Sequence, residues 1–173
     1  MNGWRRLTAV VGMVTLGTAG PCLAQDVVAL PLGSAAPAVT VQDTSGAVRH
    51  LSWHAGGRPA VLEFYATWCQ ICAALLPRLE AAQRRYGHRV DFVVIGVGVD
   101  ETLASVRSHI EQHPEPFTYY FDNTGEAVRG FNVPATGVIV ALDARGRVVY
   151  SGAGDDQDLI AVARRAAGAA GRR

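Results

Sequence analysis

Two cysteines at the junction of two sequence patterns constrain this chain more than any other feature. The stretch FYATWCQICAALLPRLE, residues 64–80, contains Cys69 and Cys72. Residues 60–66 (AVLEFYA) are almost continuously apolar, which is typical of a central strand covered on both faces. From Cys69 onward the apolar spacing becomes helical. The sequence therefore predicts a buried strand that passes directly into a helix, with both cysteines in its first turn.

This position predicts a reactive thiol at Cys69. The unpaired N–H groups and the dipole at a helix N-terminus stabilise an anion, so we expect Cys69 to ionise below the free-thiol value of about 8.5. Cys72 follows at i+3 on the same face, close enough to form a disulfide. Cys69 should lie near the exposed end and Cys72 deeper. One thiol could then attack a substrate disulfide while the other resolves the mixed intermediate.

Other roles for the cysteine pair stay open at this point. A structural zinc site needs about four ligands, and His109 and His113, spaced i, i+4, could supply two, although they lie far from Cys72 in sequence. A purely structural disulfide would close so short a loop that it removes little entropy from the unfolded chain. A metal-handling protein that carries copper on Cys69, Cys72 and a histidine is the alternative from a different functional class.

The remaining patterns predict one α/β domain, a central mixed sheet with helices on both faces, because the connections between the elements are short. The hydrophobic content of 49% in 173 residues suffices for one globular core. We expect an N-terminal β-hairpin at 39–51, further strands at 60–66, 90–99, 117–121, 136–142 and 147–151, and helices at 69–86, 101–113, 126–130 and 155–167.

The first 24 residues are typical of a secretory signal peptide. Two arginines precede an uncharged run at residues 7–19, and Cys22-Leu23-Ala24 ends in a small-x-small pattern. A retained membrane anchor is the alternative, although the apolar stretch is short for crossing a bilayer. We expect a flexible lead-in at 25–36, a single domain at 37–168 and a basic tail at 169–173. After cleavage, the two remaining cysteines would lie in an exported compartment, where disulfides persist.

The charge balance argues against a nucleic-acid partner. All 16 basic residues are arginines, and loss of Arg5 and Arg6 leaves 16 − 2 = 14 against 15 acidic residues, a net charge of −1. Binding to nucleic acid depends on a basic surface that displaces counterions. We therefore expect no nucleic-acid binding.

The segment Trp68-Cys69-Gln70-Ile71-Cys72 after AVLEFYAT resembles the active site of thioredoxin-fold proteins. Pro77 lies eight residues after the first cysteine, and Glu63 lies six before it, at the family's buried acid position. Val133-Pro134 leads into a core strand, where the family places a cis-proline loop that faces the disulfide. The resemblance implies catalytic roles for Cys69, Cys72, Glu63 and Pro134. It also implies a substrate-binding surface, made of Trp68, Gln70, Ile71 and Val133.

Three features narrow the resemblance to the TlpA/ResA branch of exported reductases: the signal peptide, an inserted helix and strand at 101–121, and the segment GFNVPATGVIVALDARGRVV. This implies a periplasmic monomer without a cofactor that reduces disulfides in exported proteins, for example in cytochrome c maturation or copper-site assembly. A membrane reductant transporter would supply the electrons.

The chain also departs from that branch. Ile71 replaces the usual proline before the second cysteine, and Leu75 replaces a glutamate. The dipeptide between the cysteines is a main determinant of the redox potential, so a disulfide oxidase or isomerase remains an alternative.

Glu63 stands where the branch often has asparagine, within the buried strand. Strand alternation places it on one face with Val61 and Tyr65. A charged, unpaired carboxylate there would cost several kcal/mol, so we expect its pKa to rise. We predict that Glu63 lies beneath Cys72 and takes its proton, replacing the missing helix carboxylate. Solvent exposure or an ion pair with an arginine is the structural alternative.

Overall fold

The computed structural model describes residues 28–53 and 57–169. The predicted signal peptide at 1–24 lies outside these residues, as do the last four residues of the predicted tail. No helix in the described ranges combines the length and the apolarity needed to cross a bilayer.

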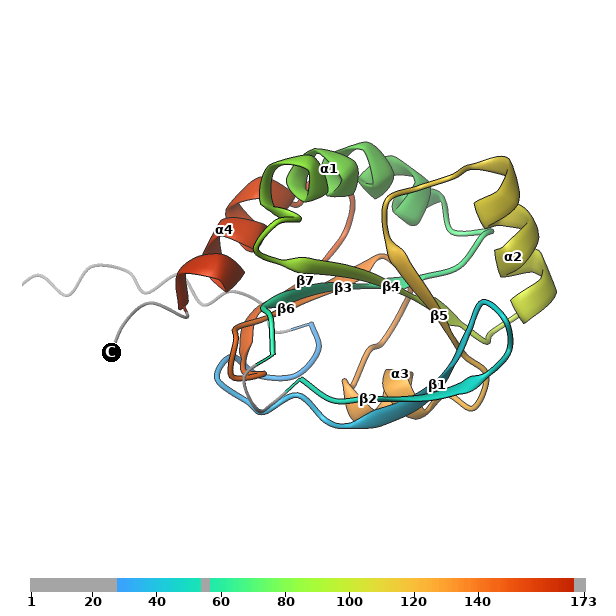
Figure 1. Ribbon diagram of the computed structural model, residues 1–173, viewed down its shortest axis with the longest axis horizontal. Helices are drawn as coiled ribbons and strands as arrows, with labels where there is room; N and C mark the ends of the chain where they lie inside the picture. Colours follow the sequence, from blue (N-terminus) through green and yellow to red (C-terminus); the bar gives the residue numbers. More distant parts are fainter. Residues whose placement is uncertain (1–27, 54–56, 170–173) are drawn as a thin grey trace, which may run out of the picture.

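A mixed sheet with the strand order β2-β1-β5-β4-β3-β6-β7 forms the centre of the described part of the chain (Figure 1). Strand β3 pairs in parallel with β4 and antiparallel with β6, so it is an interior strand of the sheet. The strands are β1 Val39–Asp43, β2 Val48–Leu51, β3 Ala60–Tyr65, β4 Asp91–Val97, β5 Thr118–Asp122, β6 Val138–Leu142 and β7 Val148–Ala153.

Helices cover both faces of this sheet, as predicted. Figure 1 shows α1 and α4 on one face and α3 on the other, beside β1 and β2. Helix α2 contributes Val106 to the core on the α1 side. The helices are α1 Gln70–Tyr86, α2 Leu103–Gln112, α3 Glu126–Gly130 and α4 Leu159–Ala169.

All six residues of β3 are buried, and alternate side chains enter different cores. Val61 and Tyr65 join the core beneath α1 and α4. Leu62 and Phe64 join the opposite core, where the Phe64 ring lies 5.6 Å from that of Phe131. The predicted alternation is therefore confirmed, and the Glu63 side chain lies on the α1 side of the sheet.

Two predicted features differ in detail from the structure. The last helix begins at Leu159 rather than at residue 155, because the Asp158 carboxylate accepts a hydrogen bond from the Ala161 N–H at 3.0 Å and caps the first turn. Residues 28–36 of the predicted flexible lead-in are bonded to β7. The Ala29 N–H donates to Ser151 Oγ at 2.8 Å, and the Gly33 N–H donates to the Val148 carbonyl at 2.8 Å.

Candidate active site

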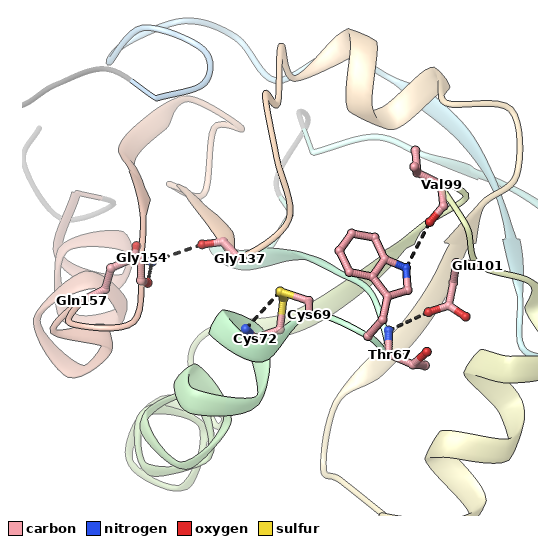
Figure 2. Close-up of a disulfide and its surroundings, with 9 residues drawn as sticks. Thr67, Cys69, Cys72, Val99, Glu101, Gly137, Gly154 and Gln157 are labelled. Carbon is pink, nitrogen blue, oxygen red and sulfur yellow. Dashed lines mark hydrogen bonds between the residues drawn. A yellow bond between two sulfur atoms is a disulfide. The ribbon is translucent and has the colours of Figure 1, made fainter.

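Cys69 and Cys72 form a disulfide at the N-terminus of α1, with their Cα atoms 5.3 Å apart (Figure 2). Cys69 is the N-cap of the helix, and its Sγ accepts a hydrogen bond from the Cys72 N–H at 3.1 Å. That donor would equally stabilise a thiolate on Cys69 in the reduced protein. Cys69 is 6% exposed and Cys72 is 1% exposed, which agrees with the predicted order of depth.

The turn between β3 and α1 is tied to the loop that follows β4. The Thr67 N–H donates to Glu101 Oε2 at 2.5 Å, and the Trp68 indole N–H donates to the Val99 carbonyl at 3.1 Å (Figure 2). Burial acts to raise the pKa of Glu101, but hydrogen bonds from Ser105, Thr67 and Thr102 outweigh it and lower that pKa. Glu101 therefore holds the active-site turn as a carboxylate.

An apolar groove of about 390 Å³ lies beside the disulfide. It brings together three of the residues expected at the site, Trp68, Val133 and Pro134. Trp68 is 51% exposed, so the groove presents a large apolar surface to solvent. Gln70 and Ile71 do not line it; both are exposed on the first turn of α1. The complete lining is Trp68, Val97, Val99, Val128, Val133, Pro134, Ala135 and Thr136.

The predicted cis bond before Pro134 is wrong, because the Val133–Pro134 peptide is trans, as is every peptide bond between described residues. The chain changes direction at two other residues with left-handed backbone, Asn132 at φ 53° and Gly137 at φ 74°. The Val133 N–H donates to the Val128 carbonyl at 2.9 Å, and the Gly137 N–H donates to the Phe64 carbonyl at 2.8 Å. These turns and bonds fix the path of the loop with a trans proline.

Gly137 is the loop residue that closes on the disulfide. A Cβ at this position would lie 2.7 Å from Ile71 Cγ2 and 3.9 Å from Cys72 Sγ, so the close approach requires glycine. The buried Gln157 amide supports the loop from behind. It donates to the Gly154 carbonyl at 2.7 Å and, at 3.5 Å, to the Gly137 carbonyl (Figure 2).

A small cavity of about 60 Å³, lined by both polar and apolar side chains, lies on the inner side of the disulfide. Glu63 reaches this cavity from β3, is 3% exposed, and has no hydrogen-bond partner for Oε1. Burial, with a smaller contribution from the charge of Glu115, raises the pKa of Glu63 to about 8. The predicted rise in pKa is confirmed. The complete lining is Glu63, Tyr65, Thr67, Cys69, Cys72, Ala73, Leu76, His109, Glu115 and Tyr119.

Sequence reasoning missed Glu101, Glu115, Gly137 and Gln157. Only Glu101 carried a usable signal: it follows the carboxyl end of a strand parallel to β3, and such strand ends meet at one edge of a sheet. His109 was singled out for its spacing to His113, as a possible metal ligand. Within the described residues, no group of three or more His, Cys, Asp and Glu side chains is placed to hold a metal ion.

Comparison with known proteins places these features in context. The Redoxin family profile matches residues 31–166. The thiol-disulfide oxidoreductase ResA of Bacillus thuringiensis is 25% identical over 120 residues, which cover 69% of this chain and 68% of ResA. The TxlA homolog of Synechocystis, a thiol:disulfide interchange protein, is 37% identical over 73 residues. Those residues are 42% of this chain and 39% of the relative, so the chain matches less than half of that protein.

Solved structures share the fold. A protein from Chlorobium tepidum described as the thiol:disulfide interchange protein DsbE has a TM-score of 0.69 and 25% identity, covering 82% of this chain and 99% of that one. A secreted disulfide oxidoreductase of Mycobacterium tuberculosis has a TM-score of 0.60 and 26% identity, covering 74% and 93%. The thioredoxin-like fold expected from the sequence is therefore confirmed.

The buried acid generates a prediction about stability. Since folding raises the pKa of Glu63 from 4.5 to about 8, its contribution to stability is full below about pH 4.5 and is lost as the pH rises towards 8. At about 1.4 kcal/mol per unit, the cost at pH 7 is at most about 3–4 kcal/mol. We expect Glu63→Gln to stabilise the oxidised protein by about 1–3 kcal/mol at pH 7 and by little at pH 5. Urea denaturation at the two pH values measures this.

The exposed Glu111→Gln is the matched control, because it removes the same charge from the surface of α2. An equal gain for Glu63→Gln at pH 5 and pH 7 would show that folding does not raise the pKa of Glu63 above this range.

Proposed function

Because the chain belongs to the Redoxin family, we propose that it is a thiol–disulfide oxidoreductase that works as a protein-disulfide reductase. The arrangement around the Cys69–Cys72 disulfide supports this most directly. The disulfide lines a small cavity that holds a buried carboxylate, and Trp68, the residue before Cys69, lines an open apolar groove where a substrate segment can bind. Both steps of disulfide exchange then have a suitable environment.

In the first step the reduced enzyme attacks. The Cys69 thiolate forms a bond to one sulfur of the substrate disulfide, and the other substrate sulfur leaves as a thiolate that takes up a proton. The product is a mixed disulfide between Cys69 and the substrate. Trp68, Val133 and Pro134 of the groove would hold the apolar side chains next to the substrate cysteine.

In the second step Cys72 resolves this intermediate. Its thiol gives its proton to the Glu63 carboxylate, and the resulting thiolate attacks the Cys69 sulfur. The bond to the substrate breaks, and the substrate leaves with the electron pair as a second thiolate. The enzyme returns to the disulfide form, and two electrons have passed to the substrate. An electron donor must then reduce Cys69–Cys72 before the next cycle.

The proposed location is the periplasm, and the proposed substrates are exported proteins that contain a disulfide. The pattern of residues 1–24 supports export, and one solved relative is described as secreted. Cytochrome c maturation or copper-site assembly is the process that the resemblance to the TlpA/ResA branch favours. A membrane reductant transporter fits the role of electron donor, because the disulfide must be reduced in an oxidising compartment.

The roles of the two cysteines can be separated by substitution. Cys69→Ser should abolish exchange, because the attacking sulfur is lost. Cys72→Ser should leave Cys69 able to form mixed disulfides that it cannot resolve, and mass spectrometry after export in cells would identify the trapped substrates. If thiol labelling of the reduced wild-type protein showed Cys72 to react faster than Cys69, the two roles would be reversed.

The direction of electron flow is measurable as a redox potential. A reductase should lie nearer the roughly −270 mV of thioredoxin than the roughly −120 mV of the oxidant DsbA, a gap worth about 7 kcal/mol. Equilibration with glutathione buffers, followed by alkylation, gives the value. A potential above about −150 mV would exclude the reductase and favour an oxidase or isomerase.

Removal of the buried base should affect one step only. Glu63→Gln keeps the shape of the side chain and should slow resolution by about 10- to 100-fold near neutral pH, because Cys72 loses its proton acceptor. The attack by Cys69 should stay nearly unchanged. In the wild type, resolution should quicken as the pH rises through about 8, where Glu63 ionises. Stopped-flow measurement of both steps checks this; equal resolution rates in the wild type and the variant would leave Glu63 a packing role.

A further inference from the structure

The cavity behind the disulfide contains most of the unpaired buried oxygens of the described chain. Side-chain oxygens that are buried and lack a hydrogen-bond partner occur on Glu63, Tyr65, Glu115 and Asp122, and the first three residues line this one cavity. Buried polar atoms are normally paired. A cavity of about 60 Å³ has room for water, which could bridge such groups. The clustering points to a site where protons are held and passed.

Glu115 is the second carboxylate of this cavity. It lies in the loop between α2 and β5, and its side chain is only 6% exposed. Its Oε2 accepts a hydrogen bond from the Tyr119 hydroxyl. Its Oε1 lies 3.8 Å from His109 Nε2. Glu115 is therefore oriented by a tyrosine on one oxygen and faces a histidine with the other.

His109 lies where the cavity meets solvent. Its side chain is 25% exposed, in contrast to the buried carboxylates. Its ring lies 5.5 Å from that of Tyr65 on the inner side and 5.0 Å from that of the exposed His113 on the outer side. An imidazole in this position can exchange protons with both the cavity and bulk water.

The chemistry of resolution requires such an outlet. Burial raises the pKa of Glu63 to about 8, so the group is mostly neutral near pH 7 and must release a proton before it can accept one from Cys72. Glu63 is 3% exposed and cannot release the proton directly to water. The chain contains no lysine that could serve as the neighbouring proton carrier.

We propose that Glu115 and His109 form the proton exit of Glu63, so that the inserted segment 101–121 takes part in the redox reaction. The proposal rests on the proposed function. The proton leaves Cys72 Sγ for the Glu63 carboxylate, passes directly or through water to Glu115, and then to His109 Nε2 and solvent. No electrons move along this route; they pass only between the sulfur atoms, and each carboxylate returns to its starting state.

The other titratable groups that face the cavity do not compete as carriers. Tyr65 of β3 and Tyr119 of β5 both point into it, with Cys69 and Cys72 of α1 opposite. Burial raises the pKa of each tyrosine well above its usual value; Glu115 adds to both shifts, and Glu101 adds to that of Tyr65. The tyrosines therefore remain protonated near neutral pH, and the Tyr119 hydroxyl donates a hydrogen bond to Glu115. The carboxylates and the imidazole are left to carry the proton.

The test uses the full chain with a disulfide peptide as substrate, and stopped-flow rates at low buffer concentration. His109→Ala should slow resolution by about 10-fold near pH 7 without affecting the attack by Cys69. Added imidazole should restore the rate, because it replaces the missing carrier at the exposed mouth. A defect that imidazole does not relieve would mean that His109 only supports the structure and would overturn the proposal.

Glu115→Gln provides a second and different signature. It should also slow resolution at low buffer, but imidazole should not rescue it, because the interruption lies inside the cavity. Loss of the neighbouring negative charge should also lower the pKa of Glu63 and shift the pH profile of resolution towards acid. Exposed Glu111→Gln and His113→Ala on the outer side are the controls and should retain wild-type rates.

Failure of the relay and failure of the proposed function give different results. If wild-type protein does not exchange disulfides with the peptide, the function itself is wrong. If the wild type exchanges disulfides and Glu63→Gln resolves slowly, the proposed function stands. If His109→Ala and Glu115→Gln then show the wild-type resolution rate and the wild-type pH profile, only the proton exit is wrong.

Discussion

The burial of β3 on both faces is the constraint on which the rest of the structure depends. Neighbouring strands fix its direction and register, so the residues after Tyr65 must emerge at one defined edge of the sheet. There the chain turns directly into α1 with Cys69 as the N-cap. A thiol is thereby held at a helix N-terminus by the core, without the freedom of an ordinary surface loop. The same strand carries Glu63 to the inner side of the disulfide.

The two sides of the disulfide differ in their titratable groups and in their access to solvent. The outer side is an open groove with the half-exposed indole of Trp68. The inner side is a small cavity in which carboxylate, phenol and imidazole groups lie among apolar side chains and which meets solvent at His109. This separation suits the two halves of disulfide exchange: contact with a protein substrate is favoured by exposed apolar surface, whereas proton transfer is favoured by buried groups whose pKa values burial can shift.

The sequence predicts the features that depend on residues near one another in the chain, and it misses those that depend on contacts between distant segments. The cysteine pair, the strand before it and the alternation at Glu63 are local patterns, and the structure has them as expected. The cis bond at Pro134 was inferred from resemblance and is absent, because Asn132 and Gly137 provide the turns. Glu115 meets Glu63 only through the packing of the insertion against the sheet, which no local pattern encodes. The sequence suggested His109 as a metal ligand because of its spacing to His113. In the structure, its Nε2 instead faces a carboxylate oxygen of Glu115.

The hydrogen bond from Thr67 to Glu101 has a consequence for how such a protein can change over evolutionary time. It joins the turn that presents Cys69 to the first residue of the insertion, at 2.5 Å and largely out of contact with water. A deletion that trimmed the insertion back to a bare connection would leave the Thr67 amide without its acceptor. Shortening the insertion would therefore also disturb the turn that holds Cys69, unless another acceptor replaced Glu101.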